Sequence, residues 1–134
     1  MRYYLTVDIG TGSTRAALVG SDGHVVSMRS IANSCCRDEA YSDSQYFLPA
    51  EREEKLLRAI DELQAENPDI NVSAVTSAGT RQTLILLDRE GKAFYALPNI
   101  DNRGRDFMDE ISDREYIYEH SGKWVTEDFC ASKL

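Results

Sequence analysis

The chain has 134 residues and a formal net charge of −8, with 15 lysine and arginine residues against 23 aspartate and glutamate residues. This length predicts a single domain with a sizeable buried core. The acidic balance argues against nucleic acid and against an anionic membrane surface as partners, because both attract clustered positive charge. A hydrophobic content of 42% with 28% charged residues is typical of a folded globular protein.

No segment has the features of a membrane span or of an export signal. The longest aliphatic run, residues 84–87, is far shorter than the ~20 residues that cross a bilayer. Asp8 interrupts the apolar stretch that follows Arg2, so a signal peptide is not expected. We therefore expect a cytoplasmic protein whose three cysteines are reduced thiols. A structural zinc site is not expected, because Cys35 and Cys36 are adjacent.

The N-terminal part of the chain predicts three short strands joined by tight turns. Residues 3–7 are β-branched and aromatic, residues 15–19 are short and apolar, and residues 24–31 resume after a Gly-Ser-Asp-Gly turn. Such short connections favour antiparallel pairing, because a parallel return needs a longer crossover. The sequence therefore predicts an antiparallel meander.

A polar stretch and the clearest helix of the chain follow. Residues 32–48 lack periodicity and predict an irregular surface excursion. The helix is expected to begin near Pro49 and to end at the Asn-Pro pair of residues 67–68. Its predicted apolar stripe consists of Leu56, Leu57, Ile60 and Leu63, and its solvent side is predicted to carry the ion pairs Glu51–Lys55 and Glu54–Arg58.

Beyond the helix, residues 72–76 predict a strand that returns parallel to the first strand. Residues 83–87 and 92–96 then predict a hairpin around an Asp-Arg-Glu-Gly turn. This order of elements predicts an α/β domain with a mixed sheet and flanking helices.

Two short helices are expected after the hairpin. The apolar faces of these helices are predicted to be Phe107, Met108 and Ile111 in the first and Tyr116 and Ile117 in the second. Gly122 predicts the end of the second helix. Thr126 resembles the N-cap of a further helix, which the printed sequence does not complete.

The loop between the first two predicted strands, residues 8–15, is the most informative segment. Its sequence is Asp-Ile-Gly-Thr-Gly-Ser-Thr-Arg. Glycines let backbone N–H groups approach a phosphate closely, and hydroxyl groups add donors. A dinucleotide fingerprint would need glycine at position 15 and a following helix, and a P-loop would need Gly-Lys-Ser/Thr. Two interpretations remain: a phosphate loop inside a β-hairpin, or an ordinary hairpin turn whose glycines supply positive φ.

Residues 4–16 resemble the first phosphate motif of the actin-like ATPase superfamily, in the version found in the FGGY family of carbohydrate kinases. Residues 75–91 are similar to that family's next strand, substrate turn and hairpin, and residues 99–103 fall at its second substrate-facing segment. Residues 118–122 and 131–134 resemble the next helix and the start of the one after it. The resemblance implies an RNase H-like fold and covers nearly the whole chain.

This resemblance implies a role for each matching residue of the loop. Asp8 matches the family's metal-and-phosphate aspartate, which would orient Mg²⁺ through water. Arg15 would add a fixed positive charge beside the transferred phosphate, although it could also be a surface arginine at a hairpin. The other residues that match nucleotide-binding positions are Gly10, Thr11, Gly12 and Ser13.

Two further segments match substrate-binding positions. Arg81 and Gln82 lie at the pair that contacts polyol hydroxyls, where glycerol-type members have Arg-Glu and xylulose-type members have Met-His; the plainer interpretation is a polar hairpin turn. Residues 99–101, Asn-Ile-Asp, look like the Asn-Val-Asp of the kinase that phosphorylates the autoinducer-2 precursor, so a small linear hydroxy-ketone is one expected substrate. Asp101 is expected either to accept a hydrogen bond from a substrate hydroxyl or to cap the following helix.

The resemblance implies ATP and a small sugar, polyol or hydroxy-ketone as substrates, with Mg²⁺ as the cofactor. FGGY kinases are several times longer than this chain, and their catalytic base and nucleotide-closing second domain lie beyond the region matched. We therefore expect residues 1–134 to be the truncated N-terminal part of the first domain, with the base beyond Leu134 and with no activity of its own.

Two alternatives stay open. The first is a stand-alone, non-catalytic module that binds a sugar or a partner protein, in which an exposed face would favour a homodimer. The second is another actin-like ATPase, such as a chaperone or a cell-shape protein.

Overall fold

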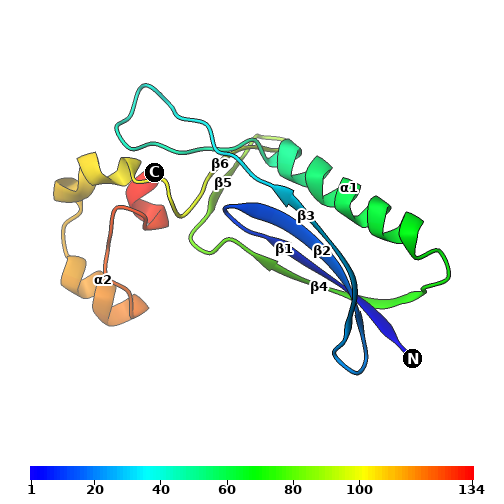
Figure 1. The fold of residues 1–134 in the computed structure, drawn as a ribbon. Helices are drawn as coiled ribbons and strands as arrows, with labels where there is room; N and C mark the ends of the chain where they lie inside the picture. Colours follow the sequence, from blue (N-terminus) through cyan, green and yellow to red (C-terminus); the bar gives the residue numbers. More distant parts are fainter. The chain divides into compact units, whose positions relative to one another are not determined.

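The computed structural model describes residues 1–134, in which six strands and one long helix precede a series of short helices (Figure 1). The strands are β1 (Tyr3–Ile9), β2 (Ser13–Gly20), β3 (Val25–Ala32), β4 (Val72–Gly79), β5 (Leu84–Leu87) and β6 (Ala93–Leu97). The α-helices are α1 (Pro49–Glu66) and α2 (Arg114–Ser121), and the 3₁₀ helices are η1 (Arg103–Glu110) and η2 (Cys130–Lys133).

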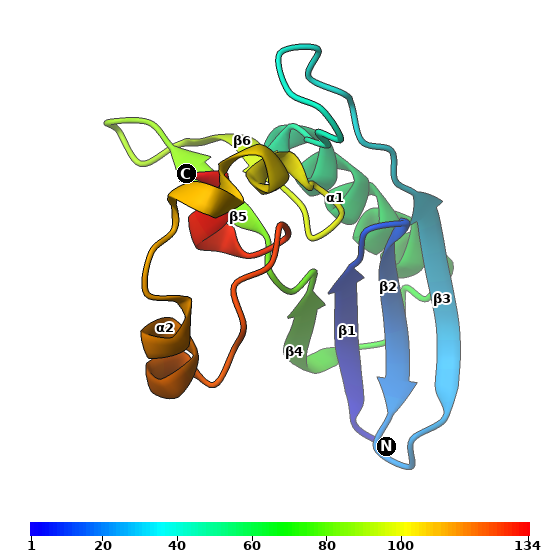
Figure 2. The same ribbon diagram turned by 90° about the vertical axis from the view of Figure 1, so that its left-hand side faces the viewer.

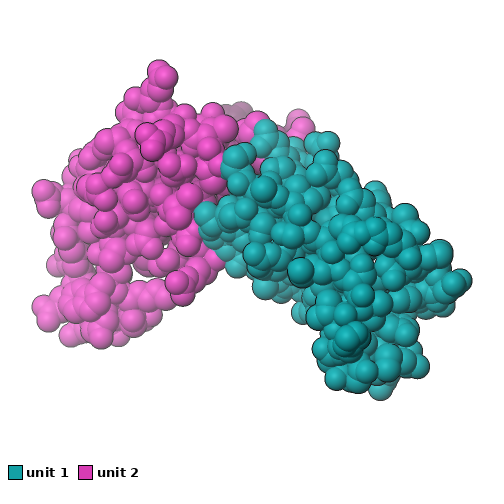
Figure 3. Space-filling view, in the orientation of Figure 1, with its two compact units in different colours: residues 1–34, 49–80 teal, residues 35–48, 81–134 magenta.

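The chain forms two compact units, which Figure 3 distinguishes by colour. Unit 1 comprises residues 1–34 and 49–80, and unit 2 comprises residues 35–48 and 81–134. Each unit has its own sheet, four-stranded in unit 1 and two-stranded in unit 2. The two units are therefore described separately.

Unit 1 is built on a mixed sheet with the strand order β3-β2-β1-β4 (Figure 2). The first three strands are antiparallel neighbours, and β4 pairs with β1 in parallel. Both predicted pairings are confirmed, and β1 and β4 are longer than the sequence predicted. The extra length matters because it places Asp8 directly opposite Arg15 in the β1–β2 register.

Helix α1 covers one face of this sheet and closes an apolar core. Alternate residues of a strand point to the same face, so β1 and β2 present one row each to the helix. The buried core consists of Leu5, Val7, Ala16 and Leu18 from the strands and Ala59 and Leu63 from α1. Full burial of a leucine stabilises a fold by about 1.5–3 kcal/mol. These contacts therefore fix the positions of β1 and β2 and of the ends of the loop that joins them.

The helix begins at Pro49 and ends at Glu66, as predicted, but its faces differ from the prediction. Leu57 is 54% exposed, and the small Ala59 takes the buried position instead. The two predicted ion pairs are not formed. Lys55 donates to the carbonyl oxygen of Ala32 at 2.9 Å, and Arg58 lies 3.7 Å from Glu62.

Unit 2 contains the predicted hairpin of β5 and β6 together with the short helices η1, α2 and η2, and the rest of it is irregular. The excursion of residues 35–48 joins this hairpin through backbone bonds between Phe47 and Ala96. Part of the excursion is interior rather than surface, since Ser44 is only 2% exposed. Helix α2 ends at Gly122, whose φ of 70° provides the left-handed cap expected there.

Two expectations for the C-terminal region are wrong. A short helix is present around Phe107, as the 3₁₀ helix η1, but Phe107 is 40% exposed and does not form a buried apolar face. Thr126 does not cap a helix, because η2 begins at Cys130 after Phe129. Its hydroxyl bonds to Asp128 instead. None of the helices combines the length and the apolar character needed to span a bilayer.

Candidate functional site

The loop between β1 and β2 borders a hollow on unit 1 that gathers every residue predicted to bind nucleotide. The lining residues are Asp8, Gly10, Thr11, Gly12, Ser13, Arg15, Ser30 and Ala32. We call this the loop hollow. Asp8 is its only acidic side chain and Arg15 its only basic one.

Backbone hydrogen bonds give the loop a fixed shape. The Gly10 N–H donates to the Ser13 carbonyl at 2.9 Å, which closes the turn. The Asn33 N–H donates to the Gly12 carbonyl at 2.9 Å, which ties the turn to the end of β3. On the other side, the Thr80 N–H and hydroxyl both donate to the Ile9 carbonyl, at 3.0 and 2.8 Å.

The Asn33 side chain holds the loop in place through two hydrogen bonds, a role that the sequence did not predict. Its Nδ2 donates to the Gly10 carbonyl at 2.9 Å, and its Oδ1 accepts from the Thr14 hydroxyl at 3.1 Å. Thr14 is completely buried, so this hydroxyl depends on Asn33 for its partner. The available signal was an asparagine directly after a strand that runs beside a glycine loop, but Asn33 fell within a stretch interpreted as irregular surface.

The conformation of the two loop glycines contradicts one part of the hairpin-turn interpretation, namely that they supply positive φ. Positive φ occurs at Gly23, Gly91 and Gly122, but not at Gly10 or Gly12. A Cβ at Gly10 would lie 3.2 Å from the Ser13 carbonyl oxygen, so the tight turn favours glycine there. A Cβ at Gly12 would meet nothing within 4 Å. Nothing in the chain therefore requires glycine at position 12, and its effect is to leave the backbone open to a close approach from outside.

Asp8 and Arg15 form an ion pair across the two strands at the edge of the loop hollow. Arg15 Nη1 lies 3.5 Å from Asp8 Oδ2, and both side chains are about half exposed, at 52% and 47%. Pairs this exposed are worth only about 0–1 kcal/mol, so either partner can leave to bind a ligand at little cost.

These groups fit a phosphate with Mg²⁺. Mg²⁺ is usually held by one or two carboxylates together with substrate phosphates, and it keeps several waters. Asp8 supplies one carboxylate, Arg15 supplies a guanidinium that matches phosphate geometry, and the open backbone at Gly12 allows phosphate oxygens to come close.

The predicted substrate pair lies in unit 2, in the turn before β5. Gln82 has a φ of 55°, a left-handed conformation that is uncommon for glutamine and is often held at functional sites. Arg81 and Gln82 line a second hollow together with Lys123, Trp124 and Thr126. We call this the Trp124 hollow. Next to the pair, the Thr83 hydroxyl is buried without a hydrogen-bond partner in the chain.

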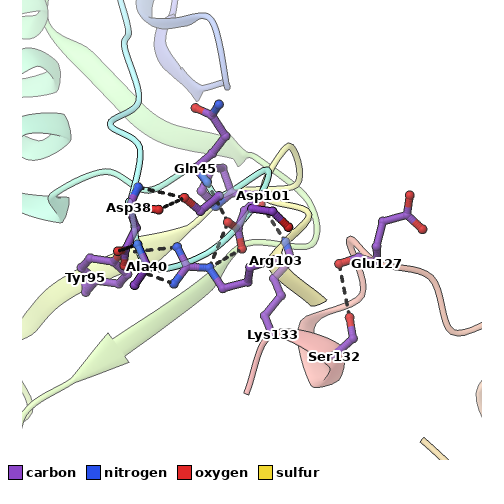
Figure 4. Close-up of polar contacts among 12 residues, drawn as sticks. Asp38, Ala40, Gln45, Tyr95, Asp101, Arg103, Glu127, Ser132 and Lys133 are labelled. Atoms are coloured by element: carbon purple, nitrogen blue, oxygen red, sulfur yellow. Dashed lines mark hydrogen bonds and ion pairs between the residues drawn. The ribbon is translucent and has the colours of Figure 1, made fainter. Parts of the chain in front are cut away.

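Asp101 is not among the residues of the Trp124 hollow, and it is completely buried. Both of its carboxylate oxygens accept from Arg103 Nε at 3.0 Å, and Oδ1 also accepts from the Gln45 N–H at 2.7 Å (Figure 4). The helix-capping interpretation is wrong, because Asn102 is the N-cap of η1 and no side chain caps it. Contact between Asp101 and a substrate hydroxyl stays a prediction.

Arg103 is the centre of a buried polar network that the sequence did not predict. Its side chain is 9% exposed, donates to the Tyr95 hydroxyl at 3.3 Å and lies 3.8 Å from Asp38 (Figure 4). The Tyr95 hydroxyl donates to Asp38 at 3.3 Å, and burial raises the pKa of this phenol. Lys133 Nζ donates to the Pro98 carbonyl at 2.7 Å. Burial lowers the pKa of Lys133, although the negative charge of Asp101 acts to raise it.

A family model for the N-terminal domain of FGGY carbohydrate kinases matches residues 3–134. The chain belongs to the FGGY family of carbohydrate kinases. The candidate sugar kinase YoaC of Bacillus subtilis (strain 168) is 37% identical over 131 residues, which are 98% of this chain and 27% of that protein. The chain thus spans about a quarter of the length of the curated relative that it matches.

Solved structures of carbohydrate kinases share the fold. A xylulose kinase from Brucella ovis superposes with a TM-score of 0.89 at 21% identity, over 98% of this chain and 28% of that one. Plasmodium falciparum glycerol kinase, solved with ADP, gives a TM-score of 0.87 at 21% identity, over 99% of this chain and 28% of that one. The fold is therefore the RNase H-like, actin-like ATPase fold that the resemblance implied.

Proposed function

We propose that residues 1–134 form the phosphate-binding and acceptor-binding part of an ATP-dependent carbohydrate kinase, which transfers the γ-phosphate of ATP to a hydroxyl of a small sugar, polyol or hydroxy-ketone. The observation that carries this proposal is the loop hollow. It combines a rigid loop, an open glycine that the chain itself does not need, one carboxylate and one guanidinium. Because the chain belongs to the FGGY family, we infer that the phosphate bound in the loop hollow is the one that a carbohydrate kinase transfers.

In this proposal, the loop backbone from Gly10 to Ser13 receives the phosphates of ATP. Arg15 leaves Asp8 and binds the transferred phosphate, where positive charge is needed as negative charge develops. When bound, Mg²⁺ would neutralise phosphate charge, and Asp8 would hold it through water. Arg81 and Gln82 offer a guanidinium fork and an amide to the acceptor hydroxyls. The proposed transfer also needs a catalytic base and a nucleotide-closing domain, which we expect outside residues 1–134.

The test uses the protein that the cell produces from the gene for this chain, purified at its native length. We expect ATP-dependent phosphorylation of at least one member of a panel of sugars, polyols and hydroxy-ketones, detected by ADP release and product mass. Asp8→Ala should abolish turnover while leaving the fold intact. Asp61→Ala, which removes an exposed carboxylate from α1 in the same unit, is the matched control and should keep full activity. Sugar binding without any phosphate transfer would instead favour a non-catalytic binding module.

A further inference from the structure

The Trp124 hollow carries positive charge in a strongly acidic chain. Arg81 and Lys123 both line it, and no acidic residue does. The chain as a whole has 23 acidic against 15 basic residues, so two neighbouring cations without a carboxylate are unlike the general surface. The other polar groups of the hollow are the amide of Gln82 and the hydroxyl of Thr126, which donates to Asp128 and can still accept a hydrogen bond.

Neither cation is neutralised inside the molecule. The ion pairs of unit 2 are made by Arg103, Arg105 and Arg114, and none includes Arg81 or Lys123. The positive charge of the hollow is therefore available to an anionic ligand.

An aromatic side chain forms the apolar wall beside these cations. The Trp124 ring stacks on Tyr118, with 4.2 Å between the ring centroids and 12° between the planes. The stacking fixes the indole orientation, yet Trp124 is still 58% exposed. A rigid aromatic surface next to a few polar groups is typical of small-molecule sites, and the C–H groups of a sugar chain can pack against it.

We propose that the acceptor bound in the Trp124 hollow is a polyhydroxy carboxylic acid, a sugar acid of the aldonate type, rather than a neutral sugar or polyol. The carboxylate is held by Arg81 and Lys123, the hydroxyls bond to Gln82 and Thr126, and the carbon chain lies against Trp124. The role of this ligand as phosphate acceptor rests on the proposed kinase function.

The two cations of the hollow suit a carboxylate, and the same arginine fork also matches a phosphate. The planar arginine fork matches the two oxygens of a carboxylate, and lysine adds a point charge. A phosphate ester would bring up to two negative charges to the same two cations, so a sugar phosphate is the competing source of an anion. The test includes it as a separate ligand.

The first measurement is calorimetric binding to the native-length protein without ATP, using D-gluconate and D-glucitol as probes. These two ligands have the same carbon chain and differ at the carboxylate. We expect D-gluconate to bind at least about tenfold more tightly, as charge-assisted hydrogen bonds provide. Equal affinity for the two ligands, or tighter binding of D-glucose 6-phosphate than of D-gluconate, would overturn the proposal.

Variants of the hollow locate the binding. Lys123→Gln should weaken D-gluconate binding about tenfold and leave D-glucitol unchanged, and Lys123→Arg should restore it. Lys92→Gln, which removes an exposed lysine at the β5–β6 turn of the same unit, is the matched control and should change neither affinity. Trp124→Ala should weaken both ligands, and Trp124→Phe should weaken them less. An equal loss for both ligands in Lys123→Gln would contradict the carboxylate contact.

Turnover separates this inference from the proposed function. Phosphorylation of D-glucitol at the same kcat/KM as D-gluconate would overturn the inference and leave the kinase function standing. Tight D-gluconate binding with no phosphate transfer from ATP to any member of the panel would contradict the kinase function and leave the inference about the ligand standing.

Discussion

In unit 1 the core cluster between the sheet and α1 is apolar, with Leu18 and Leu63 buried in it, whereas the buried residues of unit 2 include the charged Asp101, Arg103 and Lys133. Apolar contacts are non-directional and tolerate small adjustments. A buried charge is stable only while its partner is present. The two units should therefore respond differently to substitution.

Within unit 1, the residues expected to bind ligand are different from the residues that stabilise the fold. The polar groups of the loop hollow are half exposed, and the apolar core that supports them lies on the other side of the strands. Substitutions in the hollow should change ligand binding with little loss of stability. In unit 2, by comparison, Asp101 is both a predicted substrate residue and part of the interior, so its two roles cannot be separated by a single substitution.

The largest expected effect is that of Asp101→Asn in unit 2. Loss of this carboxylate leaves Arg103 buried without its closest charge partner, which typically costs about 3–5 kcal/mol. The free energy of opening of unit 2 can be read from hydrogen exchange in peptides that contain β6. Asp43→Asn removes the carboxylate of an exposed pair with Arg105 and should be far milder. Similar losses for both variants would show that burial of the charge does not govern unit 2.

Leu63→Ala tests the apolar interior of unit 1. Leu63 is completely buried, and large-to-small substitutions at such positions cost about 2–5 kcal/mol through lost transfer energy and a residual cavity. Hydrogen exchange in β1 and β2 should report the loss. Leu57→Ala lies on the same helix at a position that is 54% exposed and should change stability by less than about 0.5 kcal/mol.

Asn33→Ala should have an intermediate effect that is concentrated in the loop. It removes the bond to the Gly10 carbonyl and leaves the buried Thr14 hydroxyl without its partner, which costs about 1–3 kcal/mol. A double-mutant cycle with Thr14→Val measures the coupling directly by denaturant unfolding. Additive losses would mean that the bond between Asn33 and Thr14 does not support the loop.

Gly12→Ala should have the smallest effect on stability, within about 0.5 kcal/mol, because its Cβ meets no atom within 4 Å. It should nevertheless abolish the stabilisation by MgATP in thermal unfolding. Gly23→Ala is the complementary control, since its φ of 85° strains alanine and costs about 1–2 kcal/mol, while protection by MgATP should persist. Full protection of Gly12→Ala would mean that phosphate does not approach the backbone at this residue.

The sequence predicted the elements of unit 1 well because local rules determine them. Strands are indicated there by alternating apolar residues and short turns. The helix is bounded by Pro49 and the Asn-Pro pair. Each of these patterns is compatible with only one kind of element. The residues of the predicted phosphate loop were equally easy to select, since they lie close together in the sequence between Asp8 and Arg15. The Asp8–Arg15 pair then follows from the strand register.

The interior of unit 2 was not predictable in the same way. Asp38, Tyr95, Arg103 and Lys133 are far apart in the chain and have no common spacing, so each one alone resembles an ordinary surface residue. Asn33 was missed for a related reason, because its function depends on β3 ending beside the glycine loop. Leu57 shows the converse error, in which an apolar residue near the stripe was assigned to it although the helix turns it towards solvent.

If the proposed function holds, the ion pair between Asp8 and Arg15 affects how nucleotide affinity depends on ionic strength. On phosphate binding, Arg15 would exchange one negative partner for another, and Asp8 would exchange its cation in the same event. Salt screens the pairs on both sides of this equilibrium, so part of the screening cancels. Nucleotide affinity should therefore fall less steeply with rising salt concentration than it would at a lone surface arginine.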